Sequence, residues 1–114
     1  MTRDFAERLR DIVEASDAIV AFLSGMDFDS FDSSDALTSQ VYWKLSVIGE
    51  AANRALRERP DLAVELPELV NLTDVRNRVI HGYDSIDNLI VWTVVHKRIP
   101  PVIEQIRRFL AELR

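Results

Sequence analysis

Apolar residues at steps of three and four, with few helix-breaking residues between them, constrain the fold of this chain most strongly. Only three glycines and four prolines occur in 114 residues, so little interrupts a helix. The spacing predicts helices over about residues 3–24, 36–59, 67–82 and 86–113. The first helix has a mainly apolar stripe formed by Phe5, Leu9, Ile12, Val13, Ile19, Val20 and Leu23. We expect an all-α fold, an up-and-down bundle of four to five helices in a single domain over residues 1–114.

Breakers and polar residues set the expected ends of these helices. Gly25 ends the first helix, and the acidic, Ser-rich stretch 26–35 is interpreted as a solvated loop. The candidates for capping the second helix are Ser33, Ser34 and Asp35. Pro60 ends that helix, residues 61–66 form a connector with some helical potential, and Pro67 begins the third helix.

Two interruptions lie inside predicted helices. Gly49 is within the second helix, where a glycine costs about 1 kcal/mol relative to alanine, and this indicates close contact with a neighbouring helix. Pro100 and Pro101 are within the last helix. They must kink or break it, because a proline lacks the backbone N–H and crowds the preceding turn.

Charge, cysteine and histidine content narrow the function classes. The formal net charge of −5 argues against a nonspecific nucleic-acid coat protein, but it permits a small basic site in an acidic body. The absence of cysteine excludes a disulfide framework and a thiolate metal site, and it fits a reducing cytoplasm. The two histidines, His81 and His96, cannot form a multi-histidine cluster within one chain. We expect a cytoplasmic protein without a signal peptide, a membrane span or a cofactor.

Most of the candidate chemistry lies in one segment, Arg76-Asn77-Arg78-Val79-Ile80-His81-Gly82-Tyr83. Arg76 is a permanent cation with a planar fork suited to phosphate, and His81 can exchange protons near neutral pH. Asn77 and His81 are four residues apart, so they share a helix face and can hydrogen-bond. An arginine and a histidine suffice to cleave RNA without a metal. The histidine takes the proton of the ribose 2′-hydroxyl and the arginine stabilises charge on the phosphate.

A regular helix does not bring these two groups to one point. At 100° per residue, positions 76 and 81 lie about 140° apart around the axis. Our hypothesis is that the helix ends before His81 and that two copies of the segment combine across a homodimer. The alternative interpretation leaves Arg76 and Arg78 solvated and makes His81 a cap on its own helix.

The segment resembles the HepT branch of the HEPN superfamily, whose motif is Arg-x4-His-x-Tyr. Arg76, His81 and Tyr83 match that motif with the same spacing. The matching sequence motifs occur in the same order as in the family, over nearly the whole chain: Gly49-Glu50-Ala51, Arg76-Asn77, His81-Gly82-Tyr83 and Trp92. The chain departs from the family at Trp43 and Ser46, where a basic and an acidic residue are typical.

The resemblance implies a metal-independent endoribonuclease that acts as a homodimer and is the toxin of a HEPN/MNT toxin–antitoxin pair. By that resemblance Arg76 and His81 are catalytic, Asn77 and Arg78 support them or bind substrate, and Tyr83 is the acceptor for AMP. The implied antitoxin is a minimal nucleotidyltransferase. An AMP group two residues from His81 adds bulk and negative charge, which would block and repel an RNA backbone.

Several interpretations stay open from sequence alone. Glu50 is either a partner for Arg76 or His81, or a solvent-facing carboxylate at the edge of the apolar stripe. His96 fits a surface or packing role, and Lys97 and Arg98 are solvated charges or contacts to RNA or an acidic partner. The residues interpreted as core or interface anchors are Tyr42, Trp43 and Trp92.

Two other functions compete with the ribonuclease toxin. One is a noncatalytic HEPN module that binds a nucleotidyltransferase or a nucleotide. The other is a plain helical dimerisation protein.

Overall fold

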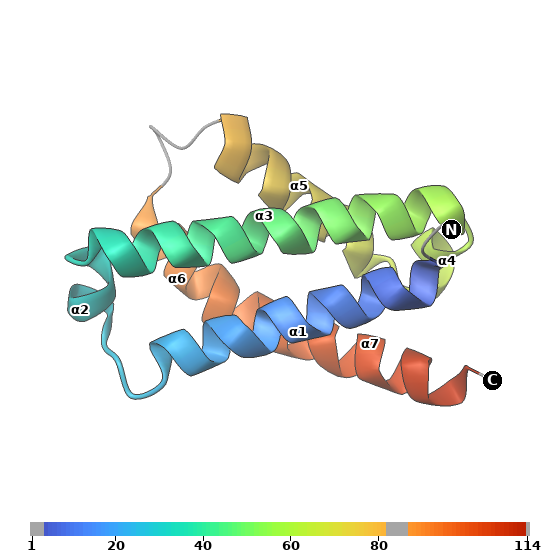
Figure 1. The fold of residues 1–114 in the computed structure, drawn as a ribbon, viewed down its shortest axis with the longest axis horizontal. Coiled ribbons are helices and arrows are strands. Elements are labelled where there is room, and N and C mark those ends of the chain that lie inside the picture. Colours follow the sequence, from blue (N-terminus) through green and yellow to red (C-terminus); the bar gives the residue numbers. More distant parts are fainter. Residues whose placement is uncertain (1–3, 82–86, 114) are drawn as a thin grey trace.

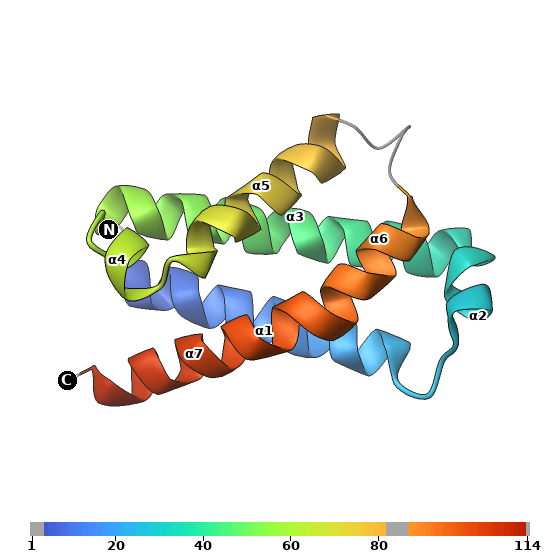
Figure 2. The same ribbon diagram turned by 180° about the vertical axis from the view of Figure 1, so that it is seen from behind.

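Helices that alternate in direction build the whole described structure. The computed structural model describes residues 4–81 and 87–113, and for residues 79–81 it describes the backbone alone. The main helices are α1 (Phe5–Leu23), α3 (Asp35–Glu58), α5 (Glu68–His81) and an arm formed by α6 (Asn88–Thr93) and α7 (Ile99–Glu112), as Figures 1 and 2 show. The predicted all-α, up-and-down bundle is confirmed. None of these described helices combines the length and apolar character of a membrane span.

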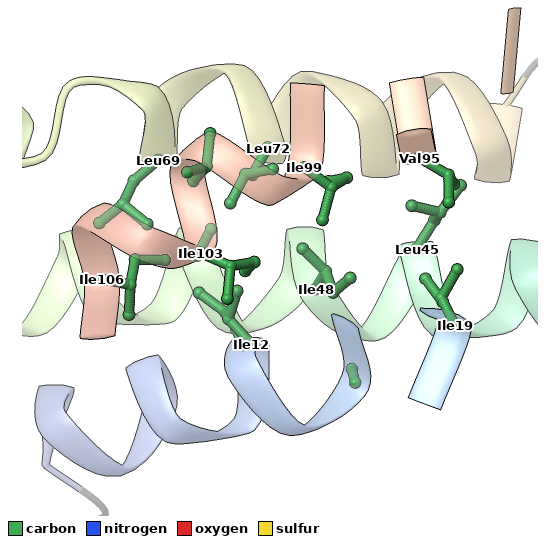
Figure 3. Packing of buried hydrophobic residues seen from close by; sticks show 14 of the residues in the cluster. Ile12, Ile19, Leu45, Ile48, Leu69, Leu72, Val95, Ile99, Ile103 and Ile106 are labelled. Carbon is green, nitrogen blue, oxygen red and sulfur yellow. The ribbon is translucent and has the colours of Figure 1, made fainter. Parts of the chain in front are cut away.

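The core lies between α1, α3, α5 and α7. Figure 3 shows aliphatic side chains from these helices converging in one layer. Ile12, Ile48, Leu69 and Ile106 are fully buried there, one from each helix. Burial of one such side chain contributes about 1.5–3 kcal/mol. The α3 helix packs against both α1 and α5, so it is the central element of the bundle (Figure 1).

Side-chain caps begin several helices. The Ser34 hydroxyl accepts a hydrogen bond from the Leu37 backbone N–H at 3.2 Å, which confirms one of the three predicted caps of α3. Asp4 caps α1 and Asp87 caps α6 in the same manner. Asp87 is the first described residue after 82–86, and its cap marks the start of the arm at α6.

The prediction of a loop over residues 26–35 is wrong in part, because a short helix, α2 (Phe28–Asp32), forms there. Asp27 caps it by accepting from the Ser30 backbone N–H at 2.9 Å. Phe31 is fully buried, and its ring lies 5.5 Å from that of Trp92 on α6. Burial of aromatic rings therefore orders a stretch whose composition is typical of a loop.

The predicted interruption at Pro100 and Pro101 is confirmed, and its form is a wide π-helical turn, η2 (Val94–Arg98), just before the prolines. The prolines lie in the first turn of α7, directly after η2, and each lacks the N–H that would donate to a carbonyl of the preceding turn. The wider turn takes up the irregularity that proline rings impose on the carbonyls before them.

The connector between α3 and α5 also has the predicted helical character. A single turn, α4 (Leu62–Glu65), forms there with Leu62 fully buried. The α5 helix then begins at Glu68, directly after Pro67. This connector returns the chain along α3, so that α5 lies against the half of α3 that contains Gly49 and Glu50.

Candidate active site

The α3 and α5 helices approach most closely at Gly49. A Cβ atom built on Gly49 would lie 1.9 Å from the Cβ of Arg76 and 2.8 Å from the carbonyl oxygen of Leu72. No real side chain tolerates such distances, so only glycine fits at this position while α5 stays in place. The close helix contact predicted from Gly49 is therefore confirmed, and the residue it admits is Arg76.

Arg76 is held at this crossing by two neighbours. Its Nη2 lies 3.3 Å from Oε2 of Glu50, one residue after the crossing glycine. Its Nη1 donates a hydrogen bond of 3.0 Å to Oδ1 of Asn77. The Nε atom is buried and has no hydrogen-bond partner among the described residues. The guanidinium is thus oriented by a carboxylate from α3 and an amide from α5.

This arrangement leaves donors for a ligand. An arginine has five N–H groups, and among the described residues one on Nη1 donates to Asn77 while Nη2 lies within ion-pair distance of Glu50. The side chain of Arg76 is 30% exposed, so the remaining terminal N–H groups are the ones placed to meet an anion. Two parallel N–H groups suit the oxygens of a phosphate.

Glu50 is the anionic centre of the site. Besides Arg76, it accepts a hydrogen bond of 2.8 Å from Nε of Arg54, one turn further along α3. That hydrogen bond, with the nearby charges of Arg76, Arg54 and Arg57, lowers the pKa of Glu50 against a smaller opposing effect of burial. Of the interpretations left open, the structure shows Glu50 as the partner of Arg76, half-buried rather than fully buried.

Arg54 was missed by the sequence reasoning. The available signal was its spacing of four residues from Glu50 on one helix, which is typical of an ion pair.

The structure does not gather every predicted site residue at this crossing. Asn77 contacts Arg76, whereas Arg78 is two positions further on, about 200° around α5 from Arg76. Arg78 instead lines a groove of about 360 Å³ between α5 and the α6–α7 arm. The groove has an apolar floor that includes Leu72, Val91 and Ile99.

The expectation that the helix ends before His81 is wrong, since α5 continues through His81 and Gly82 is the next residue. Positions 76 and 81 therefore keep the separation of about 140° that a regular helix imposes. The side chain of His81 and the whole of Tyr83 lie outside the described residues.

The remaining candidates have packing or surface roles in the described structure. Trp92 packs with Phe28 and Phe31, and His96 stacks on Trp92 with its Nδ1 2.8 Å from the Trp92 carbonyl oxygen. The packing role interpreted for Trp92 is confirmed, and the exposed His96 that stacks on it fits the surface or packing role interpreted for that residue. Trp43 is different, because 67% of it is exposed.

The other polar candidates lie on the surface or bridge helices. Lys97 and Arg98 are exposed, and Nη2 of Arg98 lies 4.0 Å from Oε2 of Glu68. Tyr42 is half-buried and donates a hydrogen bond to Oδ1 of Asn88.

We predict that Gly49→Ala destabilises the protein, although alanine favours the helix by about 1 kcal/mol. The added methyl group must push α5 away from α3, and overpacking of this kind costs about 1–3 kcal/mol or more. Urea unfolding followed by circular dichroism measures the change. Ser39→Ala, at an exposed position of the same helix, is the matched control and should be neutral or slightly stabilising. Equal stability of the two variants would contradict the close crossing.

A second prediction concerns the pH dependence of Glu50. Its lowered pKa means that its ion pairs stabilise the fold above the ordinary carboxyl pKa, and that this contribution is lost as pH falls through the lowered pKa. Glu50→Gln should therefore be less stable than the parent at neutral pH, by less than about 1 kcal/mol for a half-exposed pair. The difference should vanish in acid. Glu104→Gln, which affects an exposed pair with Arg108, is the control. A Glu50 difference that persists unchanged in acid would refute the assignment.

Comparison with known proteins places this chain in a family. The family model described as Ribonuclease HepT-like matches residues 6–109. The protein named "Putative RNase MJ0125" of Methanocaldococcus jannaschii is 29% identical over 111 residues, which cover 97% of this chain and 95% of that protein. Another from the same organism, "Putative RNase MJ1380", is 31% identical and covers 91% of this chain and 94% of that protein.

A third relative extends the match to a second organism. "Probable ribonuclease HepT" of Thermococcus cleftensis is 29% identical over 88% of this chain and 90% of that protein. No solved structure matches the chain at a significant level. The family model covers the helices that meet at Gly49 and the complete Arg76-to-Tyr83 motif. The chain belongs to the HepT-like ribonuclease family.

Proposed function

We propose that this protein is a metal-independent endoribonuclease toxin that cleaves RNA with Arg76 and His81. The observation that carries the proposal is the fixed guanidinium of Arg76, oriented by Glu50 and Asn77 with further N–H groups at the surface. Membership of the HepT-like family supports RNA as the substrate. The proposed site of action is the cytoplasm.

The proposed reaction uses the RNA's own 2′-hydroxyl as nucleophile. The imidazole of His81 accepts the 2′-hydroxyl proton as the 2′-oxygen attacks the adjacent phosphorus. Arg76 donates hydrogen bonds to the phosphate oxygens, where negative charge increases in the transition state. The bond from phosphorus to the 5′-oxygen breaks, and that oxygen takes up a proton from water. The imidazolium of His81 then releases its proton to water, which restores the base. The products are a 2′,3′-cyclic phosphate and a 5′-hydroxyl end.

A homodimer supplies the geometry that one helix lacks. Because α5 continues through His81, positions 76 and 81 lie on different sides of the same helix. We propose that Arg76 of one protomer acts with His81 of the other, with the active site at the interface between the two copies.

Regulation is proposed to act on Tyr83, two residues after His81. A minimal nucleotidyltransferase antitoxin would transfer AMP from a nucleoside triphosphate to the Tyr83 hydroxyl, releasing pyrophosphate. The attached phosphate adds negative charge beside the site and repels RNA phosphates. Asn77 supports this site through its hydrogen bond with Arg76, and Arg78 is proposed to contact substrate from the groove side of α5.

We predict that Arg76→Ala and His81→Ala each abolish most RNA cleavage by the purified protein in the presence of a metal chelator. Loss of the His81 imidazole, the general base, should lower the cleavage rate about 10²–10⁴-fold. Loss of the Arg76 guanidinium should lower it about 10²–10³-fold. The matched controls are His96→Ala and Arg108→Ala, both at exposed positions away from the crossing. They should cleave like the parent protein. Folded variants that all cleave equally, or a parent that cleaves no RNA, would favour the noncatalytic binding module.

Mixing the two inactive variants tests the shared site. When Arg76→Ala and His81→Ala protomers are exchanged into one dimer, one of its two sites regains both groups. Part of the parent activity should return on mixing, whereas neither variant alone regains it. No recovery in a demonstrated mixed dimer would show that each site is built within a single chain.

We also predict the modification at Tyr83. Coexpression with the proposed minimal nucleotidyltransferase antitoxin should increase the intact mass by one or more AMP units and suppress RNA cleavage. Tyr83→Phe should prevent both effects, while Tyr42→Phe, the only other tyrosine, should not. Neutralisation without any added mass would refute modification and leave occlusion by the partner.

A further inference from the structure

An exposed tryptophan lies in line with the candidate active site. Of the two tryptophans, Trp92 is half-buried among aromatic rings, but Trp43 on α3 is 67% exposed. It shares one face of α3 with residues spaced at alternating steps of four and three. We call this face the α3 strip, and its members are Trp43, Val47, Glu50, Arg54 and Arg57.

The strip leads directly to Arg76. Glu50 is a member of the strip and pairs with Arg76. Trp43 precedes Glu50 by seven residues, which is about 10 Å along a helix that rises 1.5 Å per residue. An indole at this distance can contact a base while a phosphate of the same strand meets Arg76.

The charge of this surface suits a polyanion. Arg54 and Arg57 belong to the strip and Arg76 lies beside it, and among the described members of the strip Glu50 is the one carboxylate that they face. The side chain of Arg54 is 52% exposed, so it remains accessible while it pairs with Glu50. This local excess of positive charge contrasts with the net charge of −5 for the whole chain. Such a surface concentrates nucleic-acid phosphates near the site.

We infer that the α3 strip binds single-stranded RNA, with a base stacked on Trp43 and phosphates contacted by Arg54 and Arg57. This inference rests on the proposed ribonuclease function and identifies the form of RNA that the site accepts. A duplex keeps its base faces stacked inside, whereas a single strand presents them to an aromatic ring. The protein therefore selects unpaired RNA through a residue outside the catalytic pair.

A second copy of the chain is the competing occupant, because exposed tryptophans also anchor protein interfaces. The excess of arginine favours RNA on the strip itself, since a strip that faced its own copy would meet like charge, whereas the proposed dimer needs contact only at Arg76 and His81.

The test measures RNA binding separately from cleavage. In a His81→Ala background, Trp92→Phe leaves Trp43 as the single tryptophan, and its fluorescence reports stacking directly. The probes are an oligouridine of about ten nucleotides and an RNA duplex of the same length. The single strand should quench Trp43 strongly, and the duplex should quench it much less.

Substitutions at Trp43 then separate stacking from apolar contact, with affinity measured by the anisotropy of labelled RNA. Trp43→Leu and Trp43→Ala should each weaken single-strand binding roughly 5- to 30-fold, the equivalent of about 1–2 kcal/mol. Trp43→Phe, which keeps a ring, should retain most of the affinity. Arg54→Gln should weaken binding and reduce its dependence on salt. Val64→Ala, at an exposed apolar residue on α4, should change nothing.

The outcomes distinguish this inference from the proposed function. If the parent binds RNA and the Trp43→Leu and Trp43→Phe variants bind it with equal affinity, base stacking on Trp43 is overturned. The ribonuclease proposal then still stands. If light scattering shows that Trp43→Leu and Trp43→Ala convert a dimer to a monomer, the inference of RNA binding is overturned. The occupant of the strip is then a second copy of the chain. If the parent binds neither RNA, the inference and the proposed function fail together.

Discussion

The contact between Gly49 and Arg76 is the constraint on which the rest of the site depends. Because position 49 has no side chain, α5 can lie so close to α3 that the Cβ of Arg76 occupies the space a side chain would need. That closeness brings the guanidinium within 3.3 Å of Glu50, the next residue on α3. A glycine that weakens the helix by about 1 kcal/mol thus becomes the element that positions a cation.

The electrostatics of the site follow from this geometry. Glu50 pairs with Arg54 from its own helix and with Arg76 from α5, so one carboxylate orients two guanidinium groups. The pairing leaves the cluster with net positive charge on a chain whose overall charge is negative. A small basic surface of this kind fits an enzyme that acts on a polyanion better than a protein that coats it, which would be basic throughout.

Much of the fold was predictable because helical periodicity and breakers are local properties. Gly49 inside an apolar helix pattern indicated the crossing, and the two consecutive prolines indicated the interruption of the last helix. What sequence reasoning missed depends on contacts between distant residues. The α2 helix forms because Phe31 packs against Trp92, which lies sixty-one positions later in the chain. Composition alone cannot show that contact. Arg54 was overlooked because an ion pair on a helix surface resembles many pairs without function.

We propose that Arg76 and His81 promote attack by the ribose 2′-oxygen, and the ends of the cleaved RNA test this most directly. Fragments produced by the purified protein in the presence of a metal chelator can be analysed by mass spectrometry. Attack by the 2′-oxygen should leave a 2′,3′-cyclic phosphate at one new end and a free 5′-hydroxyl at the other. Fragments with a 3′-hydroxyl and a 5′-phosphate, the products of attack by water at the other bond, would contradict it.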